Sequence, residues 1–449
     1  MAGERWGTVG ASVTMSVESA PQRGPLTADE SIERRKSTGD AEKARLAWLH
    51  VHALDDVREQ RIEFDREINV ILGKNGVGKT TLLNLLSFVL RWDFSPWNQR
   101  AFDVEYQFEL GPWFWHVRVK NMRDRALDRD GVAGYRPEVS LHARYEEFEL
   151  RAASDRSGYQ RVINGDERRF ESVGLLLSFL FALHMDDDWA NTASAIRDPL
   201  GMRMDVTRFD EGLDVFRSIV GWLSADQPLE WESVDGASWR GNRALNGFTW
   251  GWIRPNELLA NPDAPVLVGH ERLGISQAFL DALGAVDVVA NFGVPEVQRS
   301  GESTKVSLSS FELRMKRANG DVLRHTSWSW GQQRLVAFAL YLAANKDYVV
   351  ADELVNGMHH EWIELCLREI GDRQCFLTSQ NPILVDYTNL VSVQQIQRAF
   401  VLCAVRETKP GQTARTWRNM TEREAAELWE ARTNGFESTS EVMRNRGWW

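Results

Sequence analysis

The chain has 449 residues, of which 43% are hydrophobic and 26% charged. This composition predicts one large or two ordinary globular domains with a substantial core. The net charge of −11 argues against a protein that coats nucleic acid through bulk electrostatics, although a local basic groove remains compatible with it.

The N-terminal part of the chain predicts a tail followed by a strand–loop–helix unit. Residues 1–42 lack apolar periodicity and predict a disordered tail. Apolar or alternating segments predict strands at Leu46–Leu54, Arg61–Phe64, Glu67–Leu72, Phe102–Leu110 and Phe114–Val119. The third of these runs directly into a glycine-rich loop, which a helix is expected to follow from Lys79 to about Arg91.

Residues from about 150 to 300 are irregular, with Gly, Pro and Trp breaking the periodic segments. We expect a mainly helical insertion there, and no long coiled coil, because sustained heptads are missing. Its longest apolar run, Val173–Leu183, is too short to span a bilayer and predicts a buried helix.

The C-terminal part alternates strand and helix signals. These predict a strand region at Thr304–Lys316 with a turn at Asn319–Gly320, a helix at Gly331–Asn345, a strand at Asp347–Ala351, a helix at His360–Ile370 and a strand at Gln374–Thr378. A capping box at Thr421 and Glu424 begins a further helix, for which Asn434–Gly435 is the expected end.

Two βα units late in the chain and one early in it predict an α/β nucleotide-binding domain that is split by the insertion. Only the two ends together would make the parallel sheet. The expected parts are a tail at 1–42, an N-terminal lobe at 43–150, an insertion that acts as a lid or binds a partner at 151–300, a C-terminal lobe at 301–400, and a strand and helical tail at 401–449.

The cysteines Cys366, Cys375 and Cys403 have neither metal-ligand spacing nor the density of a disulfide framework. Since no secretory signal is recognisable, we expect a reducing, cytoplasmic location without a membrane partner.

Residues Gly73–Thr80 match the phosphate-loop pattern in full, between a predicted strand and a predicted helix. Its glycines let successive backbone N–H groups point at phosphate oxygens, and the helix dipole favours the same anion. Lys79 is expected between the β- and γ-phosphates of ATP, and the Thr80 hydroxyl on Mg²⁺. The expected nucleotide-binding residues of this loop are Gly73, Asn75, Gly76, Gly78, Lys79, Thr80 and Thr81.

The predicted strand Tyr348–Ala351 ends in two carboxylates, Asp352 and Glu353. They lie at the carboxyl edge of the sheet, where open α/β sheets bind ligands. Asp352 is expected to hold Mg²⁺ through water, and Glu353 to polarise the attacking water as general base.

The segment Ser327–Arg334 resembles the signature motif of ABC-type ATPases. Ser329, Gly331 and Gln332 match it, whereas Trp328 and Trp330 stand where Leu and Gly are usual. The resemblance implies that this loop closes on the γ-phosphate held by a second subunit. A serine hydroxyl, a glycine amide and a helix start also form an anion site physically, although Ser329 as a simple helix cap remains the alternative.

Two further stretches resemble SMC/RecF/OLD-like ATPases, including ATPase subunits of bacterial anti-phage systems. Asp352–His359 is similar to an Asp-Glu-x-Glu-Asn-Gly-Leu-His stretch, with Val355 in place of the second Glu. Phe376–Pro382 is similar to a Thr-Ser-His-Asn-Pro loop, in which Gln380 replaces a histidine that contacts the γ-phosphate. This replacement puts fast hydrolysis in doubt, because Gln carries no charge. Gln99 and Gln107 are both candidates for the γ-phosphate-sensing glutamine.

The resemblance implies a P-loop NTPase of the ABC-type head class, with a mixed parallel sheet core and an antiparallel β subdomain. It implies an ATPase that uses ATP and Mg²⁺ and forms a head-to-head dimer or higher homo-oligomer. We expect it to gate a separate effector, such as a nuclease, in an anti-phage defence complex. The alternatives are a RecF-like DNA-repair ATPase, with DNA as a partner, and a nucleotide-dependent scaffold with slow turnover.

Overall fold

The computed structural model describes residues 44–91, 94–97, 99–110, 113–123, 135–145, 148–155, 158–163, 166–170, 209, 229–233, 240–241, 255–301, 303–308, 311–345, 347–380, 383–435 and 437–448. All of them belong to one compact unit, Glu42–Trp449. The tail expected at 1–42 and the apolar run Val173–Leu183 lie outside the described residues.

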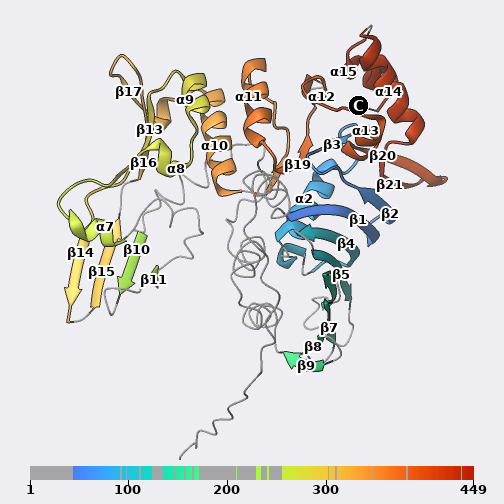
Figure 1. Ribbon diagram of the computed structural model, residues 1–449, viewed down its shortest axis with the longest axis horizontal. Coiled ribbons are helices and arrows are strands. Elements are labelled where there is room, and N and C mark those ends of the chain that lie inside the picture. Colours follow the sequence, from blue (N-terminus) through green and yellow to red (C-terminus); the bar gives the residue numbers. More distant parts are fainter. Residues whose placement is uncertain are drawn as a thin grey trace, which may run out of the picture. The chain divides into compact units, whose positions relative to one another are not determined.

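A five-stranded sheet joins the two ends of the chain, in the order β18-β19-β3-β20-β21 (Figure 1). Its strands are β3 (Ile68–Leu72), β18 (Tyr348–Ala351), β19 (Gln374–Thr378), β20 (Phe400–Lys409) and β21 (Gln412–Asn419). Strand β3 pairs in parallel with β19 and β20, so an N-terminal strand lies between two C-terminal ones. The expectation that both ends share one parallel sheet is confirmed.

The helix α2 (Lys79–Arg91) follows β3 as the sequence predicts. Its Leu82, Leu83, Leu85, Leu86 and Val89 are fully buried. They pack in one cluster with apolar residues of β3, β18 and β19. Burial of such side chains contributes about 1.5–3 kcal/mol each, so this contact fixes the start of α2 against the sheet.

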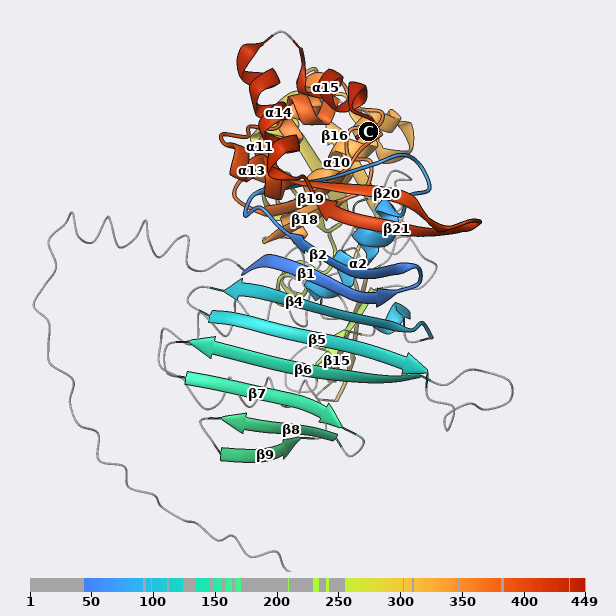
Figure 2. The same ribbon diagram turned by 90° about the vertical axis from the view of Figure 1, so that its right-hand side faces the viewer.

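An eight-stranded antiparallel sheet carries the rest of the N-terminal lobe, in the order β2-β1-β4-β5-β6-β7-β8-β9 (Figure 2). Its strands are β1 (Ala44–Leu54), β2 (Val57–Glu63), β4 (Phe102–Leu110), β5 (Trp113–Arg123), β6 (Tyr135–Tyr145), β7 (Phe148–Asp155), β8 (Gly158–Ile163) and β9 (Asp166–Phe170). The pairing of β1 with β4 shifts register twice, between Leu46 and Trp48 and between Val51 and Ala53. The 3-10 helix η1 (Ser95–Trp97) precedes β4.

The expectation of a mainly helical insertion at 151–300 is wrong for the part that the structure describes. The antiparallel sheet continues through β9, and the expected boundary at residue 150 falls inside β7. These strands have few regular apolar alternations in sequence, but each pairs with its neighbour along its length. Backbone ladders and tertiary context therefore override a weak local pattern.

Two four-stranded sheets follow, in the orders β11-β10-β15-β14 and β12-β13-β16-β17. Their strands are β10 (Leu229–Ser233), β11 (Arg240–Gly241), β12 (Leu267–Val268), β13 (Asp287–Asn291), β14 (Glu296–Ser300), β15 (Ser303–Leu308), β16 (Glu312–Lys316) and β17 (Val322–Arg324). Short helices accompany them: α7 (Pro255–Ala260), α8 (His270–Leu273) and α9 (Gln277–Leu283). The hairpin expected at Asn319–Gly320 joins β16 to β17, with Gly320 at φ 87°.

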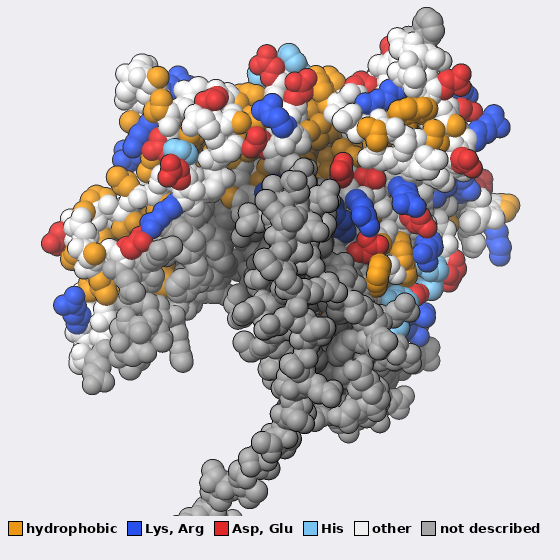
Figure 3. All heavy atoms as spheres, viewed as in Figure 1, with side chains coloured by type: hydrophobic (Ala, Val, Ile, Leu, Met, Phe, Trp, Pro, Cys, Tyr) orange, Lys and Arg blue, Asp and Glu red, His pale blue; other side chains and the backbone are white. Residues whose placement is uncertain are grey.

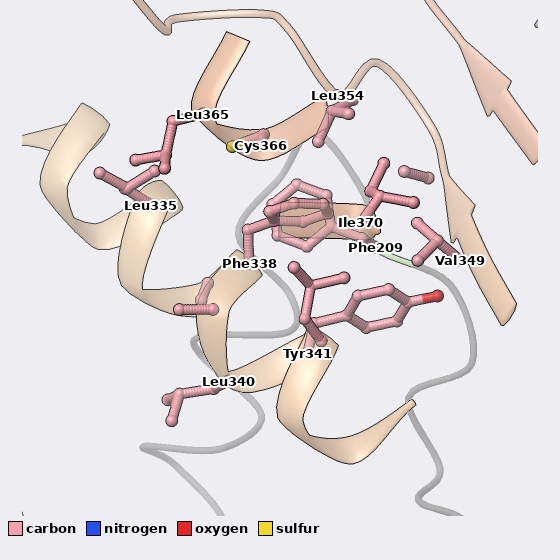
Figure 4. Packing of buried hydrophobic residues seen from close by; sticks show 14 of the residues in the cluster. Phe209, Leu335, Phe338, Leu340, Tyr341, Val349, Leu354, Leu365, Cys366 and Ile370 are labelled. Carbon is pink, nitrogen blue, oxygen red and sulfur yellow. The ribbon is translucent and has the colours of Figure 1, made fainter. Parts of the chain in front are cut away.

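Helices α10 (Trp330–Ala344) and α11 (His360–Ile370) pack in the larger apolar core. Phe209 is fully buried there and forms an isolated bridge with Ala351 at the end of β18. Figure 4 shows its ring against those of Phe338 and Tyr341, at centroid distances of 5.2 and 5.9 Å. Phe209, from the expected insertion, thus contributes to the core behind the acidic strand.

Besides β20 and β21, the C-terminal region contains the helices α12 (Ile383–Asp386), α13 (Val393–Ala399), α14 (Glu422–Asn434) and α15 (Thr439–Asn445). Thr421 and Glu424 form the predicted capping box, and Gly435 ends α14 in the left-handed conformation at φ 66°. The three cysteines are free and buried. None of the helices in the described ranges is long and apolar enough to cross a membrane.

Glu424 gives this region a pH-dependent contribution to stability. Hydrogen bonds from Arg418 and from Thr421 lower its pKa from 4.5 to about 2. Because the folded pKa is depressed, the contribution is present above pH 4.5 and is lost as the pH falls through about 2. We expect Glu424→Gln to lower the free energy of unfolding by about 1 kcal/mol at neutral pH, and the difference from wild type to shrink below pH 4.5.

Urea unfolding at several pH values measures this difference. Glu430→Gln, an exposed position on the same helix, is the control and is expected to stay within about 0.5 kcal/mol of wild type. A Glu424→Gln effect of equal size at neutral and at strongly acidic pH would contradict the ion-pair explanation.

Candidate functional site

The loop between β3 and α2 has the backbone of an anion-binding nest. Gly73, Gly76 and Gly78 all have positive φ, at 143°, 81° and 96°. A Cβ on Gly73 would lie 2.3 Å from the Cys403 carbonyl oxygen, so only glycine fits there. The backbone curvature that the phosphate-loop prediction requires is therefore present in this structure.

Lys79 lies inside this loop and is only 8% exposed. Its Nζ donates hydrogen bonds to the carbonyl oxygens of Gly73, at 2.6 Å, and Lys74, at 3.2 Å. The ammonium is held by the loop that curls around it, next to the exposed Asn75 and Gly76. An anion that enters the nest would meet this charge together with the backbone N–H groups.

Thr80 and Asp352, the two residues expected to hold Mg²⁺, are neighbours. Thr80 Oγ1 lies 3.1 Å from Asp352 Oδ2, although 272 positions separate them in the chain. Mg²⁺ prefers oxygen ligands and usually keeps several waters, so Thr80 Oγ1 could bind it directly and Asp352 through one of these waters. Asp352 Oδ1 accepts a hydrogen bond from Thr378 at 2.5 Å, which orients the carboxylate. This donor set fits Mg²⁺.

Glu353 is held in a strained conformation at the end of β18. Its φ is 55°, in the left-handed region that a residue with a side chain rarely adopts, and its side chain is buried. Its backbone N–H donates to Thr378 Oγ1 at 3.0 Å, while Arg334 donates to its carbonyl oxygen. Such a conformation costs about 1–3 kcal/mol and persists where surrounding contacts enforce it, commonly at functional sites.

Gln380 is brought next to Glu353. Its backbone N–H donates to Glu353 Oε2 at 2.6 Å, and its own side chain is exposed. The loop after β19 thus positions the predicted general base through its backbone. Residues Asn381 and Pro382 of the same motif lie outside the described residues.

The signature residues gather at the N-terminus of α10. Ser329 caps the helix, since its side chain accepts from the Gln332 N–H at 3.3 Å, and Gln332 Oε1 accepts from the Ser329 N–H at 2.9 Å. The capping role considered for Ser329 is therefore present. A Cβ on Gly331 would lie 3.4 Å from the Gly357 carbonyl oxygen, so this end of α10 packs on the loop after the acidic strand.

Arg334 connects α10 to the acidic strand. It is fully buried, donates to the carbonyl oxygens of Glu353 and Leu354, and lies 4.9 Å from the Phe209 ring centroid. The structure joins the signature segment in this way to Glu353 and to Gly357.

Arg415 of β21 is a residue of the site that sequence reasoning missed. Its guanidinium lies 3.4 Å from Thr81 Oγ1, and its Cδ would be 2.9 Å from a Cβ on Gly78. Asp55 and Asp56, in the turn between β1 and β2, both pair with it. The adjacent aspartates between two predicted strands were the available signal, but nothing local in sequence linked them to residue 415.

The pKa shifts in this cluster favour ionised aspartates and a protonated arginine. Hydrogen bonds from Arg100 and then from Arg415 lower the pKa of Asp55. Burial would raise the pKa of Asp56, but its hydrogen bonds from Arg415 prevail and lower it. The hydrogen bond to Asp56 raises the pKa of Arg415, so the cation persists beside Thr81.

The two candidates for a sensing glutamine differ in their surroundings. Gln107 lies within β4, and its Oε1 accepts a hydrogen bond from Trp48 Nε1 at 3.3 Å. Gln99 lies in the segment before β4 and is exposed. Of the two, Gln99 is the more exposed.

An AAA-domain family model matches residues 49–172, which include the phosphate loop and α2 but less than half of the chain. No curated protein matches the chain. Among solved structures, it is similar to the SMC head domain from Thermotoga maritima, at 13% identity and a TM-score of 0.35, over 84% of this chain and 99% of that one.

A second similar structure is an Smc head domain with an extended coiled coil bound to the C-terminal domain of ScpA, derived from Pyrococcus furiosus. The identity is 12% and the TM-score 0.39, over 87% of this chain and all of that one. The expectation of an α/β fold with a glycine loop between a strand and a helix is confirmed in this coarse form by the β3–loop–α2 unit and the mixed sheet, and the AAA-domain match includes that unit.

Proposed function

We propose that the chain is an ATPase of the ABC-type head class that binds Mg-ATP at Gly73–Thr80 and hydrolyses it with Glu353 as general base. The observation that carries the proposal is the connection of Thr80, Asp352, Thr378 and Glu353 by hydrogen bonds of 2.5–3.1 Å. It supports the proposal because Asp352 and Glu353, the proposed metal-binding carboxylate and general base, lie side by side at the carboxyl edge of the sheet.

In this mechanism Lys79 and the N–H groups of the nest bind the β- and γ-phosphates. Thr80 and Asp352 would hold Mg²⁺, which neutralises phosphate charge when bound. Glu353 accepts the proton of the attacking water. The Gln380 N–H and the Thr378 hydroxyl fix the Glu353 side chain and backbone, so little motion is needed to orient the base.

Ser329, Gly331 and Gln332 are proposed to act on the nucleotide of a second copy. Ser329 and Trp330 are exposed at the N-terminus of α10, and this helix start packs on the loop at Gly357. A capped helix start with an exposed hydroxyl favours an anion brought by another chain. ATP would then link two copies, because each nucleotide would lie between the phosphate loop of one copy and the signature residues of the other.

The dimer is proposed to gate a separate effector, such as a nuclease, in an anti-phage complex. This part of the proposal rests on the resemblance of the Asp352–His359 and Phe376–Pro382 stretches. Figure 3 shows basic and acidic side chains interspersed over the described part of one face, with no broad basic region of the kind that would favour the DNA-repair alternative.

One experiment separates these alternatives. Phosphate release by the purified chain is measured with and without duplex DNA, and sedimentation velocity is recorded with and without Mg-ATP. We expect slow turnover, a dimer that depends on ATP, and no stimulation by DNA. Stimulation of tenfold or more would favour the DNA-repair function, and ATP binding without turnover would favour the scaffold.

Gln380→His tests whether Gln380 restrains turnover. Its contact with Glu353 is made by the backbone, so the substitution should leave the base in place while adding a side chain that can carry charge. We expect steady-state phosphate release to rise severalfold at saturating Mg-ATP and equal dimer fraction. Gln394→His, at an exposed position on α13, is the control and should not change the rate. An unchanged or lower rate for Gln380→His would show that glutamine is a neutral substitute.

A further inference from the structure

Three histidines and two glutamates gather on one face of the antiparallel sheet. His50 and His52 come from β1, Glu59 from β2, Glu105 from β4 and His116 from β5. Figure 3 shows histidine side chains among charged ones on the side where β1 and β4 lie in Figure 1. The mechanism proposed above uses none of these five residues.

The donor atoms of His50, His52 and Glu59 converge. Glu59 Oε2 lies 3.1 Å from His50 Nε2 and 3.3 Å from His52 Nδ1, and all three atoms lie within 4.8 Å of one another. Ligands of a tetrahedral Zn²⁺ with bonds of 2.0–2.1 Å lie about 3.3 Å apart. The distances from Glu59 Oε2 to the two histidine nitrogens are therefore close to the ligand–ligand distance of a tetrahedral zinc site.

Glu105 orients His52 from the opposite side. Its Oε2 lies 2.6 Å from His52 Nε2, and its other oxygen lies 2.5 Å from His116 Nε2. If His52 Nε2–H donates to Glu105, the Nδ1 of the neutral ring presents a lone pair to Glu59. A histidine that donates one ring N–H to a carboxylate while the other nitrogen is free is the usual arrangement of a metal ligand.

The backbone is irregular at both strands that supply these donors. The register of β1 against β4 shifts between Val51 and Ala53, which marks a β-bulge at His52. Glu59 has a φ of 47°, in the left-handed region, within β2. Bulges and strained residues of this kind re-aim side chains and are frequent at binding sites.

Nearby cations are engaged elsewhere. Arg118 donates to both oxygens of Asp103, at 2.9 and 2.8 Å. Arg61 lies over the Trp48 ring, 4.1 Å from its centroid. These contacts take up the hydrogen-bond donors of Arg118 and the guanidinium of Arg61, although the Arg118 charge also interacts with Glu59 and Glu105. The carboxylates of Glu59 and Glu105 themselves favour a bound cation.

We propose that His50, His52 and Glu59 bind a divalent transition-metal cation of the zinc class, with Glu105 as the positioning residue for His52. Two imidazoles and one carboxylate suit Zn²⁺ and its neighbours rather than Mg²⁺, so the site is chemically distinct from the one at Thr80 and Asp352. Three protein ligands leave a fourth position for water. The cation would join the two strands whose turn carries Asp55 and Asp56.

The test uses the full, tag-free chain without nucleotide and measures bound zinc after dialysis and by competition with a chromogenic chelator. We expect one equivalent in the wild type. His50→Ala and His52→Ala should each weaken binding by about 100-fold or more, and Glu105→Gln by about 10–100-fold. His360→Ala, an exposed histidine at the start of α11, is the matched control and should bind as the wild type does.

Two results would overturn the proposal. One is a wild type that retains no more zinc than the His50→Ala/His52→Ala double variant. The other is zinc binding that the two substitutions leave unchanged. Circular dichroism verifies that each variant folds. In the conservative Glu59→Gln variant, a changed visible spectrum of bound Co²⁺ is expected, and an unchanged spectrum would likewise count against Glu59 as a ligand.

Discussion

Lys79→Ala is expected to abolish measurable ATP binding. The ammonium lies within the loop, bonded to the Gly73 and Lys74 carbonyl oxygens, and its donors would turn to the β- and γ-phosphates. Charge-assisted hydrogen bonds contribute about 1.5–3 kcal/mol each, so the loss of two corresponds to about 100-fold or more in affinity. Isothermal titration calorimetry with Mg-ATP measures the effect.

Lys74→Ala is the matched control for this prediction. Lys74 is an exposed lysine of the same loop, and its backbone carbonyl, which the substitution keeps, is what contacts Lys79. We expect its affinity to stay within a few-fold of wild type. Wild-type affinity in Lys79→Ala itself would show that the nest at Gly73–Gly78 does not bind the nucleotide.

Glu353→Gln is expected to bind ATP but to lower the turnover rate by about 10²–10⁴-fold, the usual contribution of a general base. The amide keeps the size of the side chain and an oxygen that can accept the Gln380 N–H, but it takes up no proton from water. Asp352 and Thr80 are unchanged, so the Mg²⁺ ligands remain. The variant should therefore accumulate as an ATP-bound dimer.

Phosphate release and sedimentation velocity together test the second prediction. Glu364→Gln, at an exposed position on α11, removes a carboxylate outside the site and should turn over at the parental rate. A parental rate in Glu353→Gln would assign the base to another residue and leave the strained backbone of Glu353 with a structural role.

Much of the nucleotide-binding lobe could be predicted from sequence, because its signals are local. The apolar run before Gly73 and the periodicity of Lys79–Arg91 each need only neighbouring residues, and both elements lie where they were expected. The capping box at Thr421 is local in the same sense. The order of the motifs along the chain then predicted that Thr80 and Asp352 belong to one site, and the structure joins them by a hydrogen bond.

The parts that sequence missed depend on long-range contacts. Strands β8 and β9 are specified by pairing with their neighbours rather than by their own apolar pattern. Arg415 contacts Thr81 because β21 belongs to the same five-stranded sheet as β3, the strand that precedes the phosphate loop and α2. The His50–Glu59 cluster likewise needs a hairpin and a bulge to form, and no spacing rule for metal ligands describes it.

Equilibrium binding of Mg-ATP to the wild-type chain tests the central claim most directly. The geometry of the nest, Lys79 and the Thr80–Asp352 pair predicts saturable binding of one nucleotide per chain, weakened when Mg²⁺ is chelated. Absence of saturable ATP binding, or binding of equal strength with and without Mg²⁺, would contradict the account.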